Sequence, residues 1–437
     1  MELPDLAQAL PLAPAEHLGG WPRGAVLLGW GLLLPGAAAA AGLSILIAGL
    51  VRVFRQAPRL APLPETEAVE GGEALADTAL TVIVPAYNEA ANIGACLTSL
   101  LSSAAPCGDW QVLLVDDSSS DGTIGIARAA AAALAREALA TADAAAARFS
   151  VLQAGPRPAG ERWVGKNWAC TQGMEQVSSA WVLFVDADVQ VQPTTLRRAL
   201  LQAEAEEADL LSLAPRLGCG CLAEWMVQPI MASLLGLGFP IAAANDPADP
   251  TAFAAGPFML FRRTAYVAIG GHRALAAEVV EDLALARRIK AGGYRLRYLL
   301  GLDALDLRMY ADLAALWEGW SKNWFLGLDR SIAKALGAAA LVVLMFSGPW
   351  LLAPAALVGA ALLPAARPLL LAALAMAMLA ISLQLALRLW TQGAFQVPLR
   401  HWWLMGAGGL LVGAIGPTSV WRTLTGQGWT WKGRPLS

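Results

Sequence analysis

The residues best suited to chemistry are acids that follow predicted β-strands. Asp116 and Asp117 stand at the end of one short apolar run, and Asp186 and Asp188 stand at the end of a later one. On an extended chain, Asp186 and Asp188 point to the same side, so both can face one hard divalent cation. Mg²⁺ or Mn²⁺ suits carboxylate oxygens and bridges naturally to a diphosphate. The spacing therefore predicts a Mg²⁺ or Mn²⁺ site at Asp186 and Asp188, with Asp117 placed to accept hydrogen bonds from a base or ribose.

The elements that position these acids alternate between strand and helix. Apolar, β-branched runs predict three buried strands: Leu80–Val84, Trp110–Val115 and Trp181–Val185. A helix with Asn88 as its N-cap is predicted after the first strand, and an Ala-rich surface helix is predicted over 127–147. This order predicts a doubly wound, Rossmann-like, mostly parallel α/β sheet. Such sheets bind ligands at the carboxyl ends of their strands, which favours a ligand site over simple turn acids at these positions.

The composition predicts a membrane protein with a soluble part. Of the 437 residues, 57% are hydrophobic and 15% are charged, whereas roughly 25% are charged in a typical soluble domain. The net charge of −3 offers no basic surface, so we expect no nucleic-acid partner. Three histidines cannot assemble a His-rich zinc site. The five cysteines include no C-x-x-C pair, which indicates reduced thiols.

The N-terminal part of the chain predicts a membrane anchor. Residues 24–51 carry no charge and are long enough as a helix to cross the roughly 30 Å hydrocarbon core. Arg52 opens a run of three arginines, so the positive-inside rule places residues 1–23 outside and the chain after the helix in the cytoplasm. Residues 52–78, which are rich in proline and acids, predict a solvated linker.

A second apolar block predicts further transmembrane helices, three or four in number, within 335–421. Its uncharged stretches are 335–366, 368–387 and 401–421. The first stretch holds prolines in its middle and predicts either one kinked span or a hairpin of two short ones. One span leaves the basic tail, 422–437, outside, whereas a hairpin brings it into the cytoplasm, so the positive-inside rule favours the hairpin. Residues 79–333 then form the cytoplasmic domain of a multi-pass inner (plasma) membrane protein.

Five ordered motifs resemble those of family 2 glycosyltransferases with the GT-A fold. They are Pro85-Ala-Tyr-Asn-Glu89, Val115-Asp-Asp-Ser-Ser-Ser-Asp-Gly-Thr123, Gly165-Lys166, Val185-Asp-Ala-Asp188 and Glu281-Asp282. More narrowly, the chain resembles membrane-bound bacterial enzymes that glycosylate carotenoids, hopanoids or other polyprenyl lipids. The terminal Trp431-Lys-Gly-Arg434 fits that subgroup. The resemblance implies a GT-A domain, a nucleotide-sugar donor and a divalent metal.

The resemblance also implies roles for single residues. The nucleotide sugar would be held by residues at three strand ends and by one lysine: Pro85, Tyr87, Glu89, Asp116, Asp117, Lys166 and Asp186. Asp117 would contact the nucleobase, and Glu89 would lie near the ribose or base. Asp186 and Asp188 would form the metal site, with Asp188 as the direct ligand. Lys166 would lie near the base or diphosphate, and a solvated surface lysine is the alternative.

The resemblance assigns the proton transfer to Glu281-Asp282. Asp282 would be the general base, and Glu281 would orient it or the acceptor. The metal neutralises charge on the leaving diphosphate, while a carboxylate on the opposite face of the sugar takes the proton of the acceptor hydroxyl. Such a single displacement inverts the anomeric centre. Because the pair opens a predicted helix, a simple capping role is the alternative.

One departure from the family bears on the acceptor. Processive polysaccharide synthases of this family carry Gln-x-x-Arg-Trp, where residues 320–324 here read Trp-Ser-Lys-Asn-Trp. Lys322 can still counter the leaving diphosphate, and Trp320 and Trp324 can stack on a sugar or sit at the membrane interface. The missing clamp disfavours processive synthesis.

The sequence therefore predicts inverting, metal-dependent transfer of one sugar from a UDP- or GDP-sugar to a membrane lipid. The apolar segment Cys221–Ala244 is either an interfacial helix that guides the acceptor or a buried core helix. A polysaccharide synthase is the alternative enzyme. A non-catalytic membrane scaffold is disfavoured because all the expected acids are present.

Overall fold

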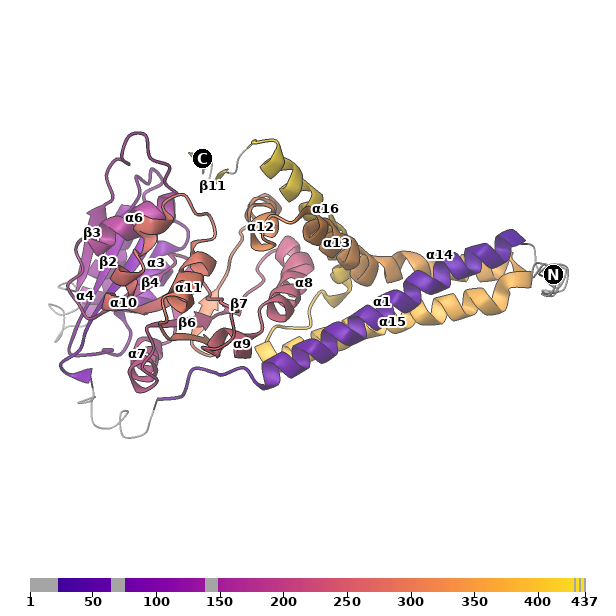
Figure 1. The fold of residues 1–437 in the computed structure, drawn as a ribbon, viewed down its shortest axis with the longest axis horizontal. Helices are drawn as coiled ribbons and strands as arrows, with labels where there is room; N and C mark the ends of the chain where they lie inside the picture. The colour runs from indigo at the N-terminus through magenta and orange to yellow at the C-terminus, as the bar shows by residue number, and fades with distance from the viewer. Residues whose placement is uncertain (1–22, 64–74, 138–147, 428–429, 432–433, 436–437) are drawn as a thin grey trace, which may run out of the picture.

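The computed structural model describes residues 23–63, 75–137, 148–427, 430–431 and 434–435. It contains an α/β domain at one end and an elongated group of apolar helices at the other (Figure 1). A short segment after the first long helix joins the two parts.

The α/β domain is built on a seven-stranded sheet with the order β3-β2-β1-β4-β8-β6-β9. Its strands are β1 (Ala79–Ala86), β2 (Asp109–Asp116), β3 (Phe149–Gln153), β4 (Trp181–Val185), β6 (Leu210–Ala214), β8 (Phe258–Arg262) and β9 (Leu296–Leu300). Only β8 runs antiparallel to its neighbours, so the prediction of a mostly parallel α/β sheet is confirmed. The three predicted strands correspond to β1, β2 and β4.

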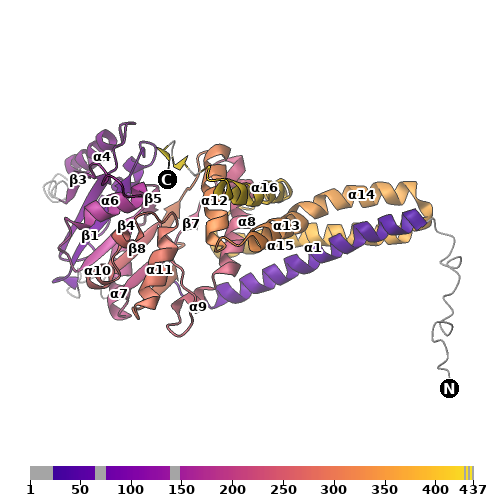
Figure 2. The ribbon, with the colours of Figure 1, turned by 45° about the horizontal axis from the view of Figure 1, so that its top comes forward.

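Helices cover both faces of this sheet (Figure 2). One apolar core packs against α3 (Ile93–Leu101), α4 (Thr123–Glu137) and α7 (Thr195–Ala205). The other core packs against α6 (Gly165–Met174), α10 (Arg263–Ala268) and α11 (Glu281–Ala291). Strands β5 (Val189–Val191), β7 (Arg216–Leu217) and β10 (Leu305–Leu307) form a small second sheet with the order β5-β10-β7.

Two local predictions on this domain are wrong. Asn88 is not an N-cap, because α3 begins at Ile93 after Asn92. Asn88 instead adopts a positive φ of 51° and accepts a hydrogen bond from the backbone of Ser120, which ties two strand-end loops together. The chain after β4 is also not extended, because it turns where the Val189 amide donates to the Asp186 carbonyl. The Ala-rich helix ends as α4 at Glu137, and residues 138–147 lie outside the described part.

Four described helices are long and apolar enough to cross a membrane. They are α1 (Arg23–Arg55), the continuous helix made by α13 (Ile332–Val342) and α14 (Gly348–Leu362), α15 (Arg367–Phe395) and α16 (Met405–Leu424). The predicted hairpin within 335–366 is therefore wrong. The chain passes its prolines as one helix because a π-helical turn over Val343–Ser347 joins α13 to α14.

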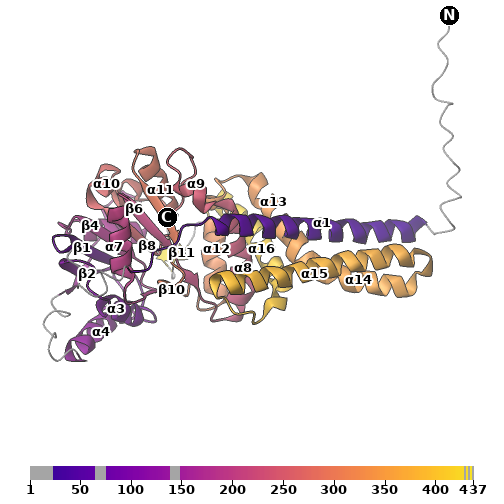
Figure 3. The same cartoon turned by 90° about the horizontal axis from the view of Figure 1, so that it is seen from below.

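The long helices pack in a defined order. Helix α1 lies beside α15 and runs parallel to it, since Gly29 meets Leu369 and Gly36 meets Met376 (Figure 3). Helix α16 instead folds back along α13. Four glycines of α16 meet positions of descending number in the continuous α13–α14 helix: Gly406 meets Trp350, Gly409 meets Ser347, Gly413 meets Val343 and Gly416 meets Ala339.

Both the linker and the tail are attached to the domain. Residues 58–60 pair with β9, because the Leu300 amide donates to Pro58 and the Leu60 amide donates to Leu300. The predicted solvated linker is therefore wrong for this stretch, while 64–74 lie outside the described residues. At the other end of the chain, β12 (Arg434–Pro435) reaches the domain through Arg434. The tail therefore contacts the α/β domain.

The predicted acceptor segment forms α8 (Leu222–Gly238) and α9 (Ile241–Asn245). One face of α8 is buried against α16 and α12 (Leu313–Gly327). Leu222, by contrast, leaves 60% of its surface exposed. The segment is thus partly core and partly exposed.

Candidate active site

Lys166 lies at the centre of the site and joins its two acidic pairs. It sits in the first turn of α6, and its Nζ lies 2.6 Å from Asp186 Oδ1 and 2.8 Å from Glu281 Oε1. Burial alone would lower the pKa of Lys166, but the two carboxylates raise it well above the usual value. The lysine is therefore a fixed cation and not a solvated surface residue.

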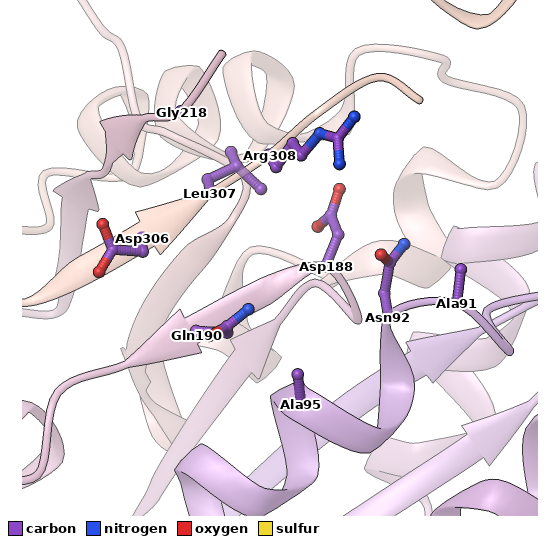
Figure 4. Close-up of a pocket in the computed structure, with 9 residues that line it drawn as sticks. All are labelled: Ala91, Asn92, Ala95, Asp188, Gln190, Gly218, Asp306, Leu307 and Arg308. Atoms are coloured by element: carbon purple, nitrogen blue, oxygen red, sulfur yellow. The ribbon is translucent and has the colours of Figure 1, made fainter. Parts of the chain in front are cut away.

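Asp188 is the acid that faces open space. The turn after β4 directs Asp186 towards Lys166, whereas Asp188 lines a cavity of about 260 Å³ together with Asn92 and Arg308 (Figure 4). Burial, followed by the negative charges of Asp186 and Glu89, raises the pKa of Asp188 to about 8.

These residues fit a divalent cation. The negative charges of Asp186 and Glu89 act on Asp188. A hard cation bound at Asp188 would relieve the repulsion among these carboxylates. Among the described residues, no group of three or more Asp, Glu, His or Cys forms a full metal cage. Mg²⁺ commonly takes only one or two carboxylates and completes its shell with substrate phosphates and water. Because Asp186 already pairs with Lys166, Asp188 is the better direct ligand.

Asp282 is held rigidly at the start of α11. Its Oδ2 accepts a hydrogen bond of 3.1 Å from the Gly256 amide, and its Oδ1 accepts one of 2.7 Å from the Leu283 amide. Burial and the neighbouring charge of Glu281 raise the pKa of Asp282 to about 6, although Lys166 acts in the opposite direction. In Glu281 the effect of Lys166 outweighs burial, so its pKa is lowered. Asp282 is thus ionised near neutral pH yet remains a usable base.

A buried network fixes α6 against the loop that precedes α11. Asn167, which is fully buried, donates from Nδ2 to the carbonyls of Leu275 at 2.6 Å and Glu278 at 2.9 Å. His272 donates its amide to the Tyr266 hydroxyl at 2.9 Å. Burial lowers the pKa of His272 to about 3, so the ring stays neutral. This network sets the separation of Lys166 from the second acidic pair.

The expected nucleotide end of the site carries two arginines. Asp117, only 4% exposed, accepts hydrogen bonds of 2.6 Å from both Arg157 and Arg434. Burial nevertheless raises the pKa of Asp117. The Arg434 guanidinium also lies 3.8 Å from the centre of the Tyr87 ring. The C-terminal strand therefore covers the place where a nucleobase is expected.

The other expected nucleotide residues lie around the same strand ends. Pro85 is buried in β1 opposite Val115. Asp116 is buried and accepts a hydrogen bond from the Ser119 amide, so it shapes the loop after β2. Glu89 accepts a hydrogen bond of 3.1 Å from the Asn92 side chain, and its negative charge acts on Asp188, so it lies near the expected metal site.

Helix α12 brings only one of its three predicted residues to the site. Lys322 interacts with Glu281, and burial lowers the pKa of the lysine. Trp320 and Trp324 are each 6% exposed and pack in the apolar cluster between α12, α8 and α16. Trp320 donates its indole N–H to Gln228, and Trp324 donates its own to a backbone carbonyl of α13. The two tryptophans anchor α12 and do not face the acids.

Sequence reasoning missed Arg157, Asn167 and Gly256 as parts of the site. No local motif marks Arg157. Gly256 packs closely against the predicted base, because a Cβ there would lie 3.0 Å from Asp282 Oδ2. Arg434 belongs to the Trp431-Lys-Gly-Arg434 motif, but no local sequence pattern predicts that it lies over the Tyr87 ring.

Residues 81–270 match the family model described as glycosyl transferase family 2. The chain is also 27% identical over 275 residues to 4,4'-diaponeurosporenoate glycosyltransferase of Staphylococcus aureus strain MRSA252, covering 60% of this chain. The match spans 65% of the relative's length, so about a third of that protein lies outside the matched region. The same protein from strain USA300 gives 27% identity over 274 residues, with the same shares covered.

Among solved structures, the chain is similar to a mannosyltransferase from Pyrobaculum calidifontis in complex with GDP-mannose and Mn²⁺. That pair has 19% identity and a TM-score of 0.44 over 88% of this chain and 99% of the other. A glucosyl-3-phosphoglycerate synthase from Mycobacterium tuberculosis, in complex with Mn²⁺, UDP and phosphoglyceric acid, gives 17% identity and a TM-score of 0.34. It covers 56% of this chain and 76% of its own. Residues 81–270 therefore carry a domain that matches glycosyl transferase family 2.

Proposed function

We propose that the protein is an inverting, metal-dependent glycosyltransferase that moves one sugar from a UDP- or GDP-sugar to a membrane lipid. The observation that carries this proposal is the position of Lys166 between the two acidic pairs. The lysine neutralises one acid of each pair and leaves Asp188 and Asp282 for a metal and for a proton.

The proposed reaction uses each of these groups once. Asp282 accepts the proton of the acceptor hydroxyl as the acceptor oxygen bonds to the anomeric carbon. The bond between that carbon and the diphosphate breaks on the opposite face, and the nucleoside diphosphate leaves with the electron pair. A divalent cation held by Asp188 would neutralise the charge that develops on the diphosphate. Lys322, near Glu281, adds a second positive charge to this part of the site.

The acceptor is proposed to be a lipid because α12 connects the site to the apolar helices. Lys322 interacts with the acids, while Trp320 and Trp324 on the same helix pack with α8 and α16. A hydroxyl at the end of a lipid held along these helices could therefore reach Asp282 without leaving the membrane. The relatives at 27% identity are named as glycosyltransferases of diaponeurosporenoate, which supports an apolar acceptor.

The membrane placement is proposed from the helix directions. Helix α1 would cross towards the domain, α13–α14 would cross away from it, and α15 would return. Helix α16 folds back along α13 and leads to Arg434, which contacts Asp117 in the domain. Three crossings and a re-entrant α16 therefore keep the C-terminus on the domain side. The basic residues after α1 place that side in the cytoplasm.

Protease protection tests this topology. A cleavable tag fused after Ser437 should be cut only in permeabilised cells, because the tail lies beside the cytoplasmic domain. Cleavage in intact cells would contradict both the re-entrant α16 and the orientation.

Metal removal and one substitution test the activity. Purified membranes should transfer radioactive sugar from a nucleotide sugar to extracted lipid, and EDTA should abolish the transfer until Mg²⁺ or Mn²⁺ is restored. Asp188→Asn should lose the transfer and should not recover with added metal. Asp306→Asn is the matched control, because Asp306 lines the same cavity but pairs with Arg216. Full activity in EDTA would overturn the metal assignment.

A further inference from the structure

A second cavity lies where the apolar helices meet the domain. Its volume is about 510 Å³, and it is formed by the ends of α1 and α15 and by the linker. Its lining includes three aromatic side chains and two arginines: Phe54, Trp390, Phe395, Arg55 and Arg59. None of them lines the cavity at Asp188.

Aromatic rings make one wall of this cavity. Phe54 meets Phe395 edge-on, with ring centres 4.7 Å apart, and lies 5.8 Å from Trp390. Phe54 and Phe395 also pack against the cluster of the domain that contains Tyr298 and Leu300. The wall therefore joins the helices to the domain and is not a mobile surface.

The linker fixes the second arginine of this cavity. Arg59 forms a parallel bridge with Leu300, flanked by hydrogen bonds of 2.9 Å and 3.0 Å to Pro58 and from Leu60. Arg55 lies in the last turn of α1. Two guanidinium groups from separate elements are thus directed to one cavity.

The two arginines have no acidic partner among the described residues. The ion pairs of the described residues involve other basic groups, and both Arg55 and Arg59 are exposed. Two like charges at one cavity repel each other unless an anion lies between them. Guanidinium groups bind phosphate oxygens through two parallel hydrogen bonds, so phosphate is the anion that suits them best.

We propose that this cavity binds the phosphate head group of an anionic membrane lipid. The proposal rests on the membrane placement given above, in which the ends of α1 and α15 lie at the cytoplasmic interface. Aromatic rings beside basic groups are typical of that level of a membrane. The bound lipid would hold α1, α15 and the linker together next to the domain.

Lipid binding can be measured without sugar transfer. Full-length protein is stripped of lipid in detergent and titrated with phosphatidylglycerol or phosphatidylcholine, and the bound lipid is counted by native mass spectrometry. We expect specific retention of phosphatidylglycerol. The double variant Arg55→Gln with Arg59→Gln should bind it roughly 10- to 30-fold more weakly, since each basic group near a membrane surface contributes about a factor of five.

Two controls separate this site from general surface charge. Arg52→Gln removes an exposed arginine of the same helix that does not line the cavity, so it should weaken binding by no more than the roughly fivefold effect of one basic group, less than the double variant does. The double variant Arg55→Lys with Arg59→Lys should bind more tightly than the glutamine variant and less tightly than the wild type, because it keeps the charge and loses the paired hydrogen bonds.

The proposal is overturned if phosphatidylcholine binds equally well, or if Arg52→Gln weakens binding as much as the double variant. Displacement of the lipid by millimolar glycerol phosphate would also contradict it, because the cavity would then be a site for free phosphate. If the double variant does not fold, two other measurements test the proposal. They are the affinity of Arg59→Gln for phosphatidylglycerol and the preference of the wild type for phosphatidylglycerol over phosphatidylcholine. Nucleoside diphosphate binding by the same samples reports on the donor site separately, so failure of the transferase proposal would be recognised as such.

Discussion

The two acidic pairs, at the turn after β4 and at the start of α11, share one arrangement. In each pair, one acid bonds Lys166: Asp186 at 2.6 Å and Glu281 at 2.8 Å. The other acid, Asp188 or Asp282, makes no ion pair with any residue in the described part of the chain.

The pairs differ in what surrounds the second acid. Asp188 faces a cavity, and burial with nearby negative charge raises its pKa to about 8. Asp282 is held by two backbone amides, and burial with the charge of Glu281 raises its pKa to about 6. A carboxyl with open space and crowded acids suits a cation, whereas one with a fixed direction and a pKa below neutral suits proton acceptance. One lysine thus allows two similar pairs to take different roles.

Among variants that keep both proposed reacting acids, Asp188 and Asp282, the largest effect is expected for Lys166→Met, which removes the cation that both pairs share. Two partly buried carboxylates would lose their partner, at a cost of about 2–4 kcal/mol in the free energy of unfolding. Transfer should fall roughly 10²-fold as the acids rearrange. Chemical denaturation and the transfer assay measure the two effects. A variant with normal stability and normal rate would show that Lys166 is only a surface residue.

The pH dependence of the rate sharpens the comparison. Asp282 accepts a proton only when ionised, so transfer should rise with pH through about 6 and fall roughly tenfold for each unit below it. Glu281 raises the pKa of Asp282 and Lys166 lowers it. Glu281→Gln should therefore move the acidic limb to lower pH, whereas Lys166→Met should move it to higher pH. Shifts in the same direction for both variants would contradict the assignment.

A smaller effect is expected for Gly256→Ala. The added methyl group would lie 3.0 Å from Asp282 Oδ2, which is tighter than ordinary contact, so the carboxylate must shift by a few tenths of an ångström. We expect a loss of about tenfold in kcat with unchanged nucleotide affinity. Gly125→Ala is the matched control, since nothing lies within 4 Å of a Cβ at that position. Equal effects of the two variants would show that the close contact has no role.

Much of the domain follows from local sequence patterns. The strands β1, β2 and β4 are mostly apolar and buried, as is typical of parallel strands covered on both faces. The turn after β4 was missed because a spacing of two residues was taken as an extended chain. The continuous helix through Pro349 was missed because a π-helical turn has no simple sequence signature.

The site was only partly predictable because several of its contacts join distant parts of the chain. Acids at strand ends identified Asp117, Asp186 and Asp188. No local pattern predicts that Arg434, 317 positions beyond Asp117, bonds it. The burial of Trp320 could not be predicted either. A tryptophan near a membrane can face a core, a sugar or the interface, and the local sequence does not distinguish these three positions.

The most direct measurement compares Asp282→Asn with Glu281→Gln in one set of samples, recording both sugar transfer and nucleoside diphosphate binding. Removing a general base typically costs about 10²- to 10⁴-fold in rate, and this cost falls on the chemical step. Asp282→Asn should therefore lose transfer while it binds the nucleotide with near-normal affinity, and Glu281→Gln should be milder. If Asp282→Asn keeps most of its activity while Glu281→Gln loses it, or if both fail to bind the nucleotide, the division of roles set by Lys166 is contradicted.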